Sequence, residues 1–175
     1  MFTLKEIDNS AVELLSALSI EAFIQAYEGV HSKSDLEAYC RDNYSVDSTE
    51  SLLNTSETEA VVAFQGSDPA VFYVLKHHSC PVELAGQSTE QKQIYVLSEH
   101  FGGGLGRQLC ESAVNKARKN KSKCLWLCVS DLNYRAQAFY GKTGFSKIGQ
   151  GPELIVGNDI LSSSIMVLSI EAAHA

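Results

Sequence analysis

A glycine-rich turn is the part of this sequence whose residue types best suit the binding of a charged ligand. It follows the short apolar run Gln93–Leu97 and precedes a segment with helical periodicity. The turn comprises Gly102, Gly103, Gly104, Leu105, Gly106 and Arg107. Glycine lets a backbone turn sharply and approach a ligand closely, because no Cβ is in the way. The free N–H groups of the first helical turn then attract phosphate, and Arg107 adds a charge-assisted contact.

Two other phosphate-binding motifs do not fit this turn. A Walker loop ends in Gly-Lys-Ser/Thr, whereas Gly106 is followed by Arg107 and Gln108. A dinucleotide fingerprint needs an early strand and an acidic residue about 20 positions further on. Here the strands come late, and the basic tract Lys116–Lys123 occupies that region. The turn therefore predicts a phosphate site of another kind, with a flexible glycine turn of no function as the alternative.

A second motif covers Asn133–Phe145, which reads NYRAQAFYGKTGF. On a helix, Ala136, Phe139 and Tyr140 share one face, because residues three and four positions apart are neighbours there. Gly144 is placed to end such a helix. Taken alone, this pattern indicates an amphipathic helix that buries its aromatic residues.

Together, the two motifs resemble those of the GNAT superfamily of acetyl-CoA-dependent N-acetyltransferases. The family's phosphate loop, Q/R-x-x-G-x-G/A after a strand, is matched by Phe101-x-x-Gly104-x-Gly106, with Phe101 in place of the usual Gln or Arg. The family's second signature, N-x-x-A-x-x-F/L-Y-x-x-x-G-F, is matched by Asn133, Ala136, Phe139, Tyr140, Gly144 and Phe145. The resemblance implies an enzyme that moves an acetyl group from acetyl-CoA to a primary amine, without a metal.

The resemblance also assigns residues to the acetyl-CoA site. The pantetheine arm would lie between the strand ending at Val96 and the strand ending at Val129, with Asn133 in contact with it. Backbone groups of Ile94, Tyr95 and Val96 would pair with the pantetheine amides, and one N–H would polarise the thioester carbonyl. The turn Gly102–Arg107 would hold the pyrophosphate. A donor fixed where charge develops in the tetrahedral state is worth about 3 kcal/mol.

The resemblance further implies a general acid and a general base. Tyr140 stands where the family places its acid, and a phenol with a pKa near ~10 can protonate a departing thiolate. A packed ring without a catalytic role is the alternative. Some relatives carry a glutamate at about the place of Glu90, which is therefore the candidate base, with a solvated loop acid as the alternative. Other relatives have a glutamate where Cys128 stands. We expect Cys128 to be a core residue, and His100 is a further candidate base.

The elements that must position these residues follow from hydrophobic periodicity. The expected helices cover residues 11–28, a segment opened by a Ser34–Glu37 capping box, a short piece near 50–54, and residues 106–120 and 133–143. The expected strands cover residues 60–65, 70–77, 93–97, 124–129, 145–148 and 164–169. Helices thus come first and strands later, which is typical of an α/β (α+β) sheet with helices on both faces. The resemblance implies a GNAT-like mixed, mostly antiparallel central sheet.

Length and composition favour one domain over residues 1–175, with an acetyl-CoA-binding core over about 90–170 and a helical substrate-side segment over about 10–56. Five scattered cysteines without a CxxC motif predict neither a disulfide framework nor a zinc site. The sequence has no apolar run of membrane-spanning length and no secretory signal pattern, so we expect a cytoplasmic protein that does not bind membranes.

Charge is distributed unevenly along the chain. Residues 92–147 carry ten of the fourteen Lys and Arg residues but only three of the twenty-one acids, so the remainder is strongly acidic. An acidic surface attracts a cationic substrate, whereas a solvated charged surface is the alternative. The basic tract 116–123 lacks interleaved aromatic residues, which argues against a nucleic-acid partner.

The acceptor amine is predicted only by a looser similarity. The segment from Phe23 to Tyr44 contains F-x-x-x-Y and Y-x-x-x-x-Y patterns that resemble the spermine/spermidine-type branch, which implies a polyamine or another small cationic amine. A protein or peptide N-acetyltransferase and a non-catalytic acyl-CoA-binding module are the alternatives, because fold does not fix function. A homodimer is a further expectation from the resemblance.

Overall fold

The computed structural model describes residues 2–78, 80–84 and 86–170. The strands are β1 (Phe2–Ile7), β2 (Thr58–Gln65), β3 (Asp68–Lys76), β4 (Ser88–Val96), β5 (Cys124–Ser130), β6 (Ser146–Gln150), β7 (Leu154–Val156), β8 (Asp159–Leu161) and β9 (Ser163–Ser169). The helices are α1 (Val12–Tyr27), α2 (Lys33–Tyr44), α3 (Val46–Leu53), α4 (Leu105–Lys119) and α5 (Tyr134–Lys142). Two short 3₁₀ turns, η1 (Asn9–Ala11) and η2 (Ser98–His100), precede α1 and α4.

Seven strands form one sheet in the order β1-β2-β3-β4-β5-β9-β6, and β7 pairs with β8. The pairs β1–β2, β5–β9 and β6–β9 are antiparallel, whereas β4–β5 is parallel. The expected mixed, mostly antiparallel sheet with helices is therefore confirmed.

Two compact units make up the chain. The first contains Met1–Val74, Gln93–Gly106 and Val156–Asn158, and the second contains Leu75–Lys92, Arg107–Ile155 and Asp159–Ala175. That residues 1–175 form one domain stays a prediction.

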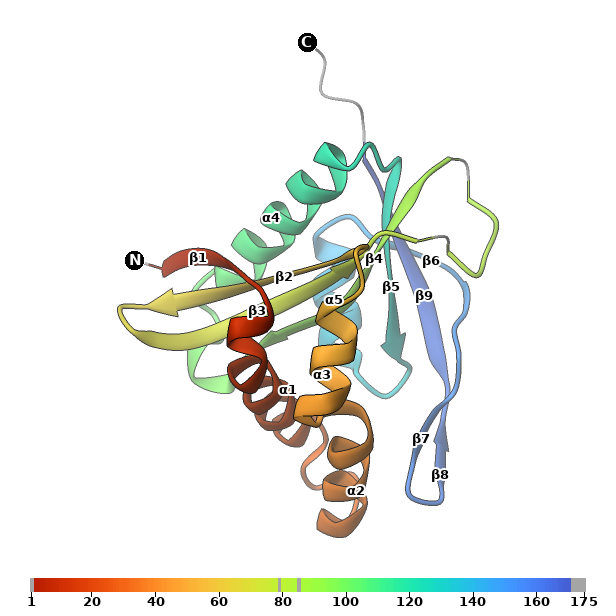
Figure 1. Ribbon diagram of the computed structural model, residues 1–175. Coiled ribbons are helices and arrows are strands. Elements are labelled where there is room, and N and C mark those ends of the chain that lie inside the picture. Colours follow the sequence, from red (N-terminus) through yellow and green to blue (C-terminus); the bar gives the residue numbers. More distant parts are fainter. Residues whose placement is uncertain (1, 79, 85, 171–175) are drawn as a thin grey trace. The chain divides into compact units, whose positions relative to one another are not determined.

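The first unit is built around α1. Its side chains Leu15, Leu18 and Ala22, which are three and four positions apart and so share one helix face, are buried against apolar residues of β2 and β3. Helices α1, α2 and α3 pack against one another (Figure 1). Gly29 ends α1 with a φ of +82°, which glycine adopts without steric strain. The structure thus confirms the helix expected over residues 11–28.

The tyrosines of the helical segment form an aromatic cluster. The ring of Tyr39 stacks on that of Phe23 with centroids 4.4 Å apart, and the rings of Tyr27 and Tyr44 lie 4.8 and 5.5 Å from Phe23. Burial raises the pKa of both Tyr39 and Tyr44. The F-x-x-x-Y and Y-x-x-x-x-Y patterns therefore build the interior of this segment, and a link to one family branch stays a prediction.

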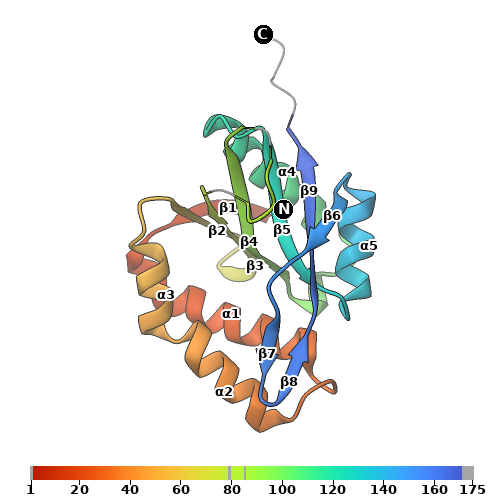
Figure 2. The ribbon, with the colours of Figure 1, turned by 90° about the vertical axis from the view of Figure 1, so that its right-hand side faces the viewer.

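The second unit centres on β5 and β9. Figure 2 shows β9 between β5 and β6, and the β5–β9 ladder runs from Cys124–Ser169 to Ser130–Ser163. Helix α4 buries Leu109, Ala113 and Ala117 completely, and the helix expected over residues 106–120 is confirmed. Basic residues fill the last turn of α4, where the helix dipole favours positive charge.

Several expected boundaries are wrong. The chain opens with β1 rather than with a helix, and the four central residues of that strand are exposed, so it carries no alternating pattern. Ser32, not Ser34, caps α2, because its Oγ accepts the Asp35 N–H at 3.2 Å. Helix α3 begins at Val46 rather than near residue 50, after the cap Ser45. The hairpin β7–β8 was not expected, and β4 begins five residues before Gln93, in a polar stretch of which Ser88, Thr89 and Gln91 are buried.

Candidate functional site

The glycine turn leads into α4, as expected, but it follows the 3₁₀ turn η2 and not the strand directly. Gly102 and Gly104 have φ values of +84° and +76°, in the left-handed region that side-chain-bearing residues rarely adopt. Among the described residues, no neighbouring atom lies within 4 Å of where a Cβ would stand on either glycine. Leu105 is buried and anchors the start of α4. The turn therefore combines a backbone that requires glycine with open space at two of its residues.

Arg107 makes an ion pair that sequence reasoning missed. Its Nε donates to Oε1 of Glu111 at 3.1 Å, one turn further along α4, and both side chains are largely exposed. The spacing i, i+4 is the signal that would have revealed this pair. A contact of Arg107 with phosphate would compete with Glu111.

The strand residues Ile94, Tyr95 and Val96 lie at the end of β4. The ring of Tyr95 packs against Phe72 at 5.8 Å, and burial raises the pKa of its hydroxyl, which hydrogen bonds to Tyr44. The side chain of Tyr95 thus serves the core, which is consistent with a site role carried by the backbone. Pairing of that backbone with a pantetheine arm stays a prediction.

The parallel ladder between β4 and β5 is short. Among the residues of the second unit, it consists of the pairs Ser88–Cys124, Thr89–Leu125 and Glu90–Trp126, and it ends before Gln91. Backbone N–H and C=O groups beyond the end of a ladder need other partners. Strand β4 thus stops pairing with β5 between Glu90 and Gln91. The side chains of both residues have polar partners.

Tyr140 is the buried residue of α5, with 7% of its surface exposed. Its ring packs edge-to-face against Phe139 and Phe145, each with centroids 5.4 Å away. Its Oη accepts a hydrogen bond at 3.3 Å from Nε2 of Gln91, which is 3% exposed. The structure thus brings Tyr140 to β4. Sequence reasoning missed Gln91, because it lies in the polar run 88–93, which carries no hydrophobic strand pattern.

Glu90 pairs with His78, a residue that sequence reasoning also missed. Nε2 of His78 and Oε2 of Glu90 form a hydrogen bond, and the side chains are 35% and 13% exposed. The His78 ring also packs against Trp126 at 5.3 Å. Oγ of Ser88 donates to the backbone carbonyl of His78 at 3.0 Å, which fixes the loop after β3. Glu90 is therefore a partly buried carboxylate in a defined environment and not a solvated loop acid.

Cys128 is exposed, so the expectation that it is a core residue is wrong. It follows Trp126 on the same face of β5, beyond the last pair of the ladder with β4. Partial desolvation of the thiol, and next the charge of Glu90, raise the pKa of Cys128 to about 11. At neutral pH the group is a thiol and cannot accept a proton from an amine.

Two other predicted residues have local structural partners. Oδ1 of Asn133 accepts the Ala136 N–H at 3.1 Å and caps α5. His100 packs edge-to-face on Phe2 with ring centroids 5.7 Å apart, and its Nε2 lies 3.7 Å from Oε1 of Glu99. Cofactor contact by Asn133 stays a prediction, as does the role of His100 as an alternative base.

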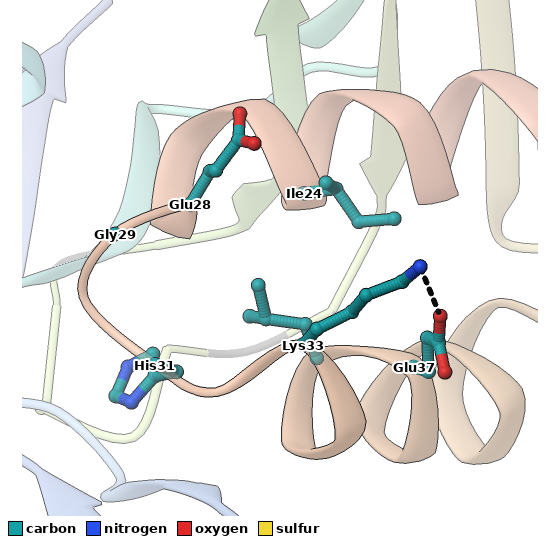
Figure 3. A pocket seen from close by; sticks show the side chains of 7 residues that line it. Ile24, Glu28, Gly29, His31, Lys33 and Glu37 are labelled. Carbon is teal, nitrogen blue, oxygen red and sulfur yellow. Dashed lines mark ion pairs between the residues drawn. The ribbon is translucent and has the colours of Figure 1, made fainter.

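A pocket of about 410 Å³ lies where α1 ends and α2 begins. Glu28 and Glu37 contribute carboxylates to its lining, together with His31 and Lys33 (Figure 3). Nζ of Lys33 lies 3.7 Å from Oε1 of Glu37, in an exposed ion pair. Within the described part of the chain, Glu28 has no cationic partner. The pocket lies in the segment predicted to face the substrate.

The described residues contain neither a metal-binding cluster nor a membrane-spanning helix. Over residues 2–78, 80–84 and 86–170, no three His, Cys, Asp or Glu side chains gather in a way that could hold a metal ion. A membrane-spanning stretch would need greater length and apolar character than any described helix has.

The sequence and the fold were then compared with known proteins. The model of the Acetyltransferase (GNAT) family matches residues 20–145. An uncharacterized N-acetyltransferase in the pepI 3' region of Lactobacillus delbrueckii subsp. lactis is 26% identical over 159 residues, which cover 82% of this chain and 83% of that protein.

Solved structures share the fold. The paiA N-acetyltransferase of Thermoplasma acidophilum, in complex with coenzyme A, superimposes with a TM-score of 0.79 at 20% identity over 97% of this chain and 99% of that chain. The ribosomal-protein-S18-alanine N-acetyltransferase of Escherichia coli has a TM-score of 0.65 at 20% identity over 99% of this chain and 97% of that chain.

The family model spans most of the chain, so this protein belongs to the GNAT acetyltransferase family. Membership supports acetyl-CoA as the donor substrate and an amine as the acceptor. The family resemblance of the two sequence motifs is thereby confirmed.

Proposed function

We propose that the protein transfers an acetyl group from acetyl-CoA to a primary amine of a small cationic molecule, such as a polyamine, by direct attack in a ternary complex. The observation that carries the proposal is the turn Gly102–Arg107. Its two left-handed glycines open onto free space ahead of α4, where backbone N–H groups can bind a diphosphate. The family assignment agrees with this use of the turn.

The reaction moves protons at the nitrogen and at the sulfur. The ammonium group of the acceptor loses a proton to a base, and the resulting amine attacks the thioester carbonyl carbon. The attack leaves the nitrogen with an extra proton, which it releases to water. When the C–S bond breaks, the sulfur takes a proton from the phenol of Tyr140. The products are the acetylated amine and the thiol of coenzyme A, and Tyr140 regains its proton from solvent.

Glu90 is the base in this proposal, and His78 stabilises it in place. A carboxylate with 13% exposure that keeps a hydrogen bond to an imidazole has a fixed direction for accepting a proton. Glu90 is itself 13% exposed, so a proton that reaches its carboxylate can pass on to water.

Glu90→Gln is expected to lower kcat/KM for the amine about tenfold near neutral pH, because the amide cannot accept a proton. The loss should shrink above pH 9, where more of the acceptor is already neutral. Initial rates of thiol release against pH measure this. Glu99→Gln is the matched control, since Glu99 also pairs with a histidine but is 64% exposed. Equal losses in both variants, or a loss independent of pH, would contradict the role of Glu90.

The acceptor is proposed to bind in the pocket at the α1–α2 junction. Glu28 and Glu37 place two carboxylates around it, and the sequence outside residues 92–147 is strongly acidic. A linear cation with several amino groups can pair an ammonium group with these carboxylates. Figure 3 shows Lys33 extended along the pocket towards Glu37, a pair that an incoming ammonium can replace.

Glu28→Gln and Glu37→Gln are each expected to raise KM for a polyamine three- to five-fold, because exposed ion pairs contribute up to about 1 kcal/mol. The KM for acetyl-CoA should not change. Glu21→Gln, on the exposed side of α1, is the control. Steady-state kinetics at low and high salt check this, since screening should reduce the difference between variant and wild type. A polyamine KM that is the same in all three variants would rule the pocket out.

A screen of acceptors tests the proposal as a whole. Thiol release from acetyl-CoA should be fastest with polyamines and other small cationic amines. Preference for an N-terminal peptide would favour a protein N-acetyltransferase instead. Binding of acetyl-CoA in calorimetry without turnover of any amine would indicate a non-catalytic acyl-CoA-binding module.

A further inference from the structure

Gln91 contacts the hydroxyl group of Tyr140 from inside the second unit. The amide of Gln91 is 3% exposed, and its Nε2 donates to Oη of Tyr140 at 3.3 Å. Its Oε1 is also buried and has no hydrogen-bond partner among the described residues. A buried amide oxygen without a hydrogen-bond partner destabilises the fold relative to a fully paired amide. An apolar residue would pack at this place without that loss of stability. The amide of Gln91 therefore points to a functional role.

The direction of the hydrogen bond suits an acid that must give its proton away. A donor from Gln91 occupies a lone pair of Oη and does not itself use the hydroxyl proton. Once the proton has left, the same N–H faces a phenolate, and hydrogen bonds to charged groups are the stronger ones. Gln91 therefore interacts more strongly with Tyr140 after proton donation than before it.

We propose that Gln91 is the positioning residue of the general acid, orienting the phenol of Tyr140 and stabilising the phenolate that remains when the coenzyme A sulfur is protonated. This inference rests on the proposed function, in which Tyr140 supplies that proton. Gln91 itself exchanges no proton and touches the reacting atoms only through Tyr140.

Gln91→Leu and Gln91→Glu test the inference through the alkaline limb of the kcat–pH profile. Without the N–H donor, the pKa of Tyr140 should rise by about one unit in Gln91→Leu and by more in Gln91→Glu, whose carboxylate repels the phenolate. The ultraviolet absorbance of phenolate can be titrated with pH for each Gln91 variant and for the same variant carrying Tyr140→Phe. The difference between the two curves gives the pKa of Tyr140 independently of turnover. We expect kcat to fall about tenfold in Gln91→Leu.

Gln137→Leu is the matched control. Gln137 lies on α5 and donates to the backbone carbonyls of Ser130 and Asp131, so its loss should lower the melting temperature without moving the alkaline limb. Where Gln91→Leu does not fold, the isosteric Gln91→Glu carries the measurement.

A double-mutant cycle separates the possible outcomes. In the Tyr140→Phe background, Gln91→Leu should have no further effect on kcat, since the partner is gone. Two results would overturn the role of Gln91 but not that of Tyr140. The first is a tenfold loss of kcat when Gln91→Leu is added to Tyr140→Phe. The second is an alkaline limb that does not move in Gln91→Leu, although Tyr140→Phe lowers kcat. Full activity of Tyr140→Phe would overturn both this role and the general acid of the proposed function.

Discussion

Tyr140→Phe is expected to lower kcat about 100-fold, because general acid catalysis contributes at least that much when the leaving group is a poor one without its proton. The phenylalanine ring keeps the contacts with Phe139 and Phe145, so the fold and the affinity for acetyl-CoA should hardly change. Initial rates with saturating polyamine give kcat, and calorimetry gives the dissociation constant of acetyl-CoA.

The control for this substitution lies on the same helix. Tyr134 is 73% exposed at the start of α5, and Tyr134→Phe removes a hydroxyl of the same chemistry. It should retain the wild-type kcat. Turnover that is undiminished in Tyr140→Phe would show that Tyr140 is a packing residue.

Gly104→Val should weaken acetyl-CoA binding about 100-fold. A side chain at a φ of +76° strains the backbone by about 1–2 kcal/mol, and the turn then moves away from the geometry that binds a diphosphate. Loss of even one charge-assisted hydrogen bond adds about 1.5–3 kcal/mol, so the two effects together approach two powers of ten. Titration of the variant with coenzyme A by calorimetry measures the effect.

Gly66→Val separates backbone strain from ligand binding. Gly66 has a φ of +66° in the β2–β3 turn and, like Gly104, has no neighbouring atom within 4 Å of a Cβ position among the described residues. Both variants should lose similar stability, but Gly66→Val should bind coenzyme A normally. Similar affinity in the two variants would contradict a phosphate site at Gly104.

The elements that sequence reasoning placed well are those with a strong local signal. Helix α4 carries Leu109, Ala113 and Ala117 at four-residue intervals, and all three are buried. The turn before it needs glycine for backbone reasons that act within a few residues. Such features follow from the chain alone because no distant partner decides them.

The polar half of the candidate site depends on partners far apart in sequence. His78 meets Glu90 because β3 and β4 are neighbours in the sheet, and Gln91 meets Tyr140 because α5 returns to β4. Neither pairing produces a periodic pattern in the amino-acid sequence. The exposure of Cys128 has the same origin, because its apolar neighbours on β5 suggest burial while the end of the β4–β5 ladder decides it.

The succession of Glu90 and Gln91 along β4 bears on the proposed mechanism. Consecutive side chains of a strand point to opposite faces, and these two have different partners, His78 for one and Tyr140 for the other. In that mechanism the base and the acid therefore belong to separate hydrogen-bonded pairs, and a substitution in one pair leaves the hydrogen bond of the other pair intact.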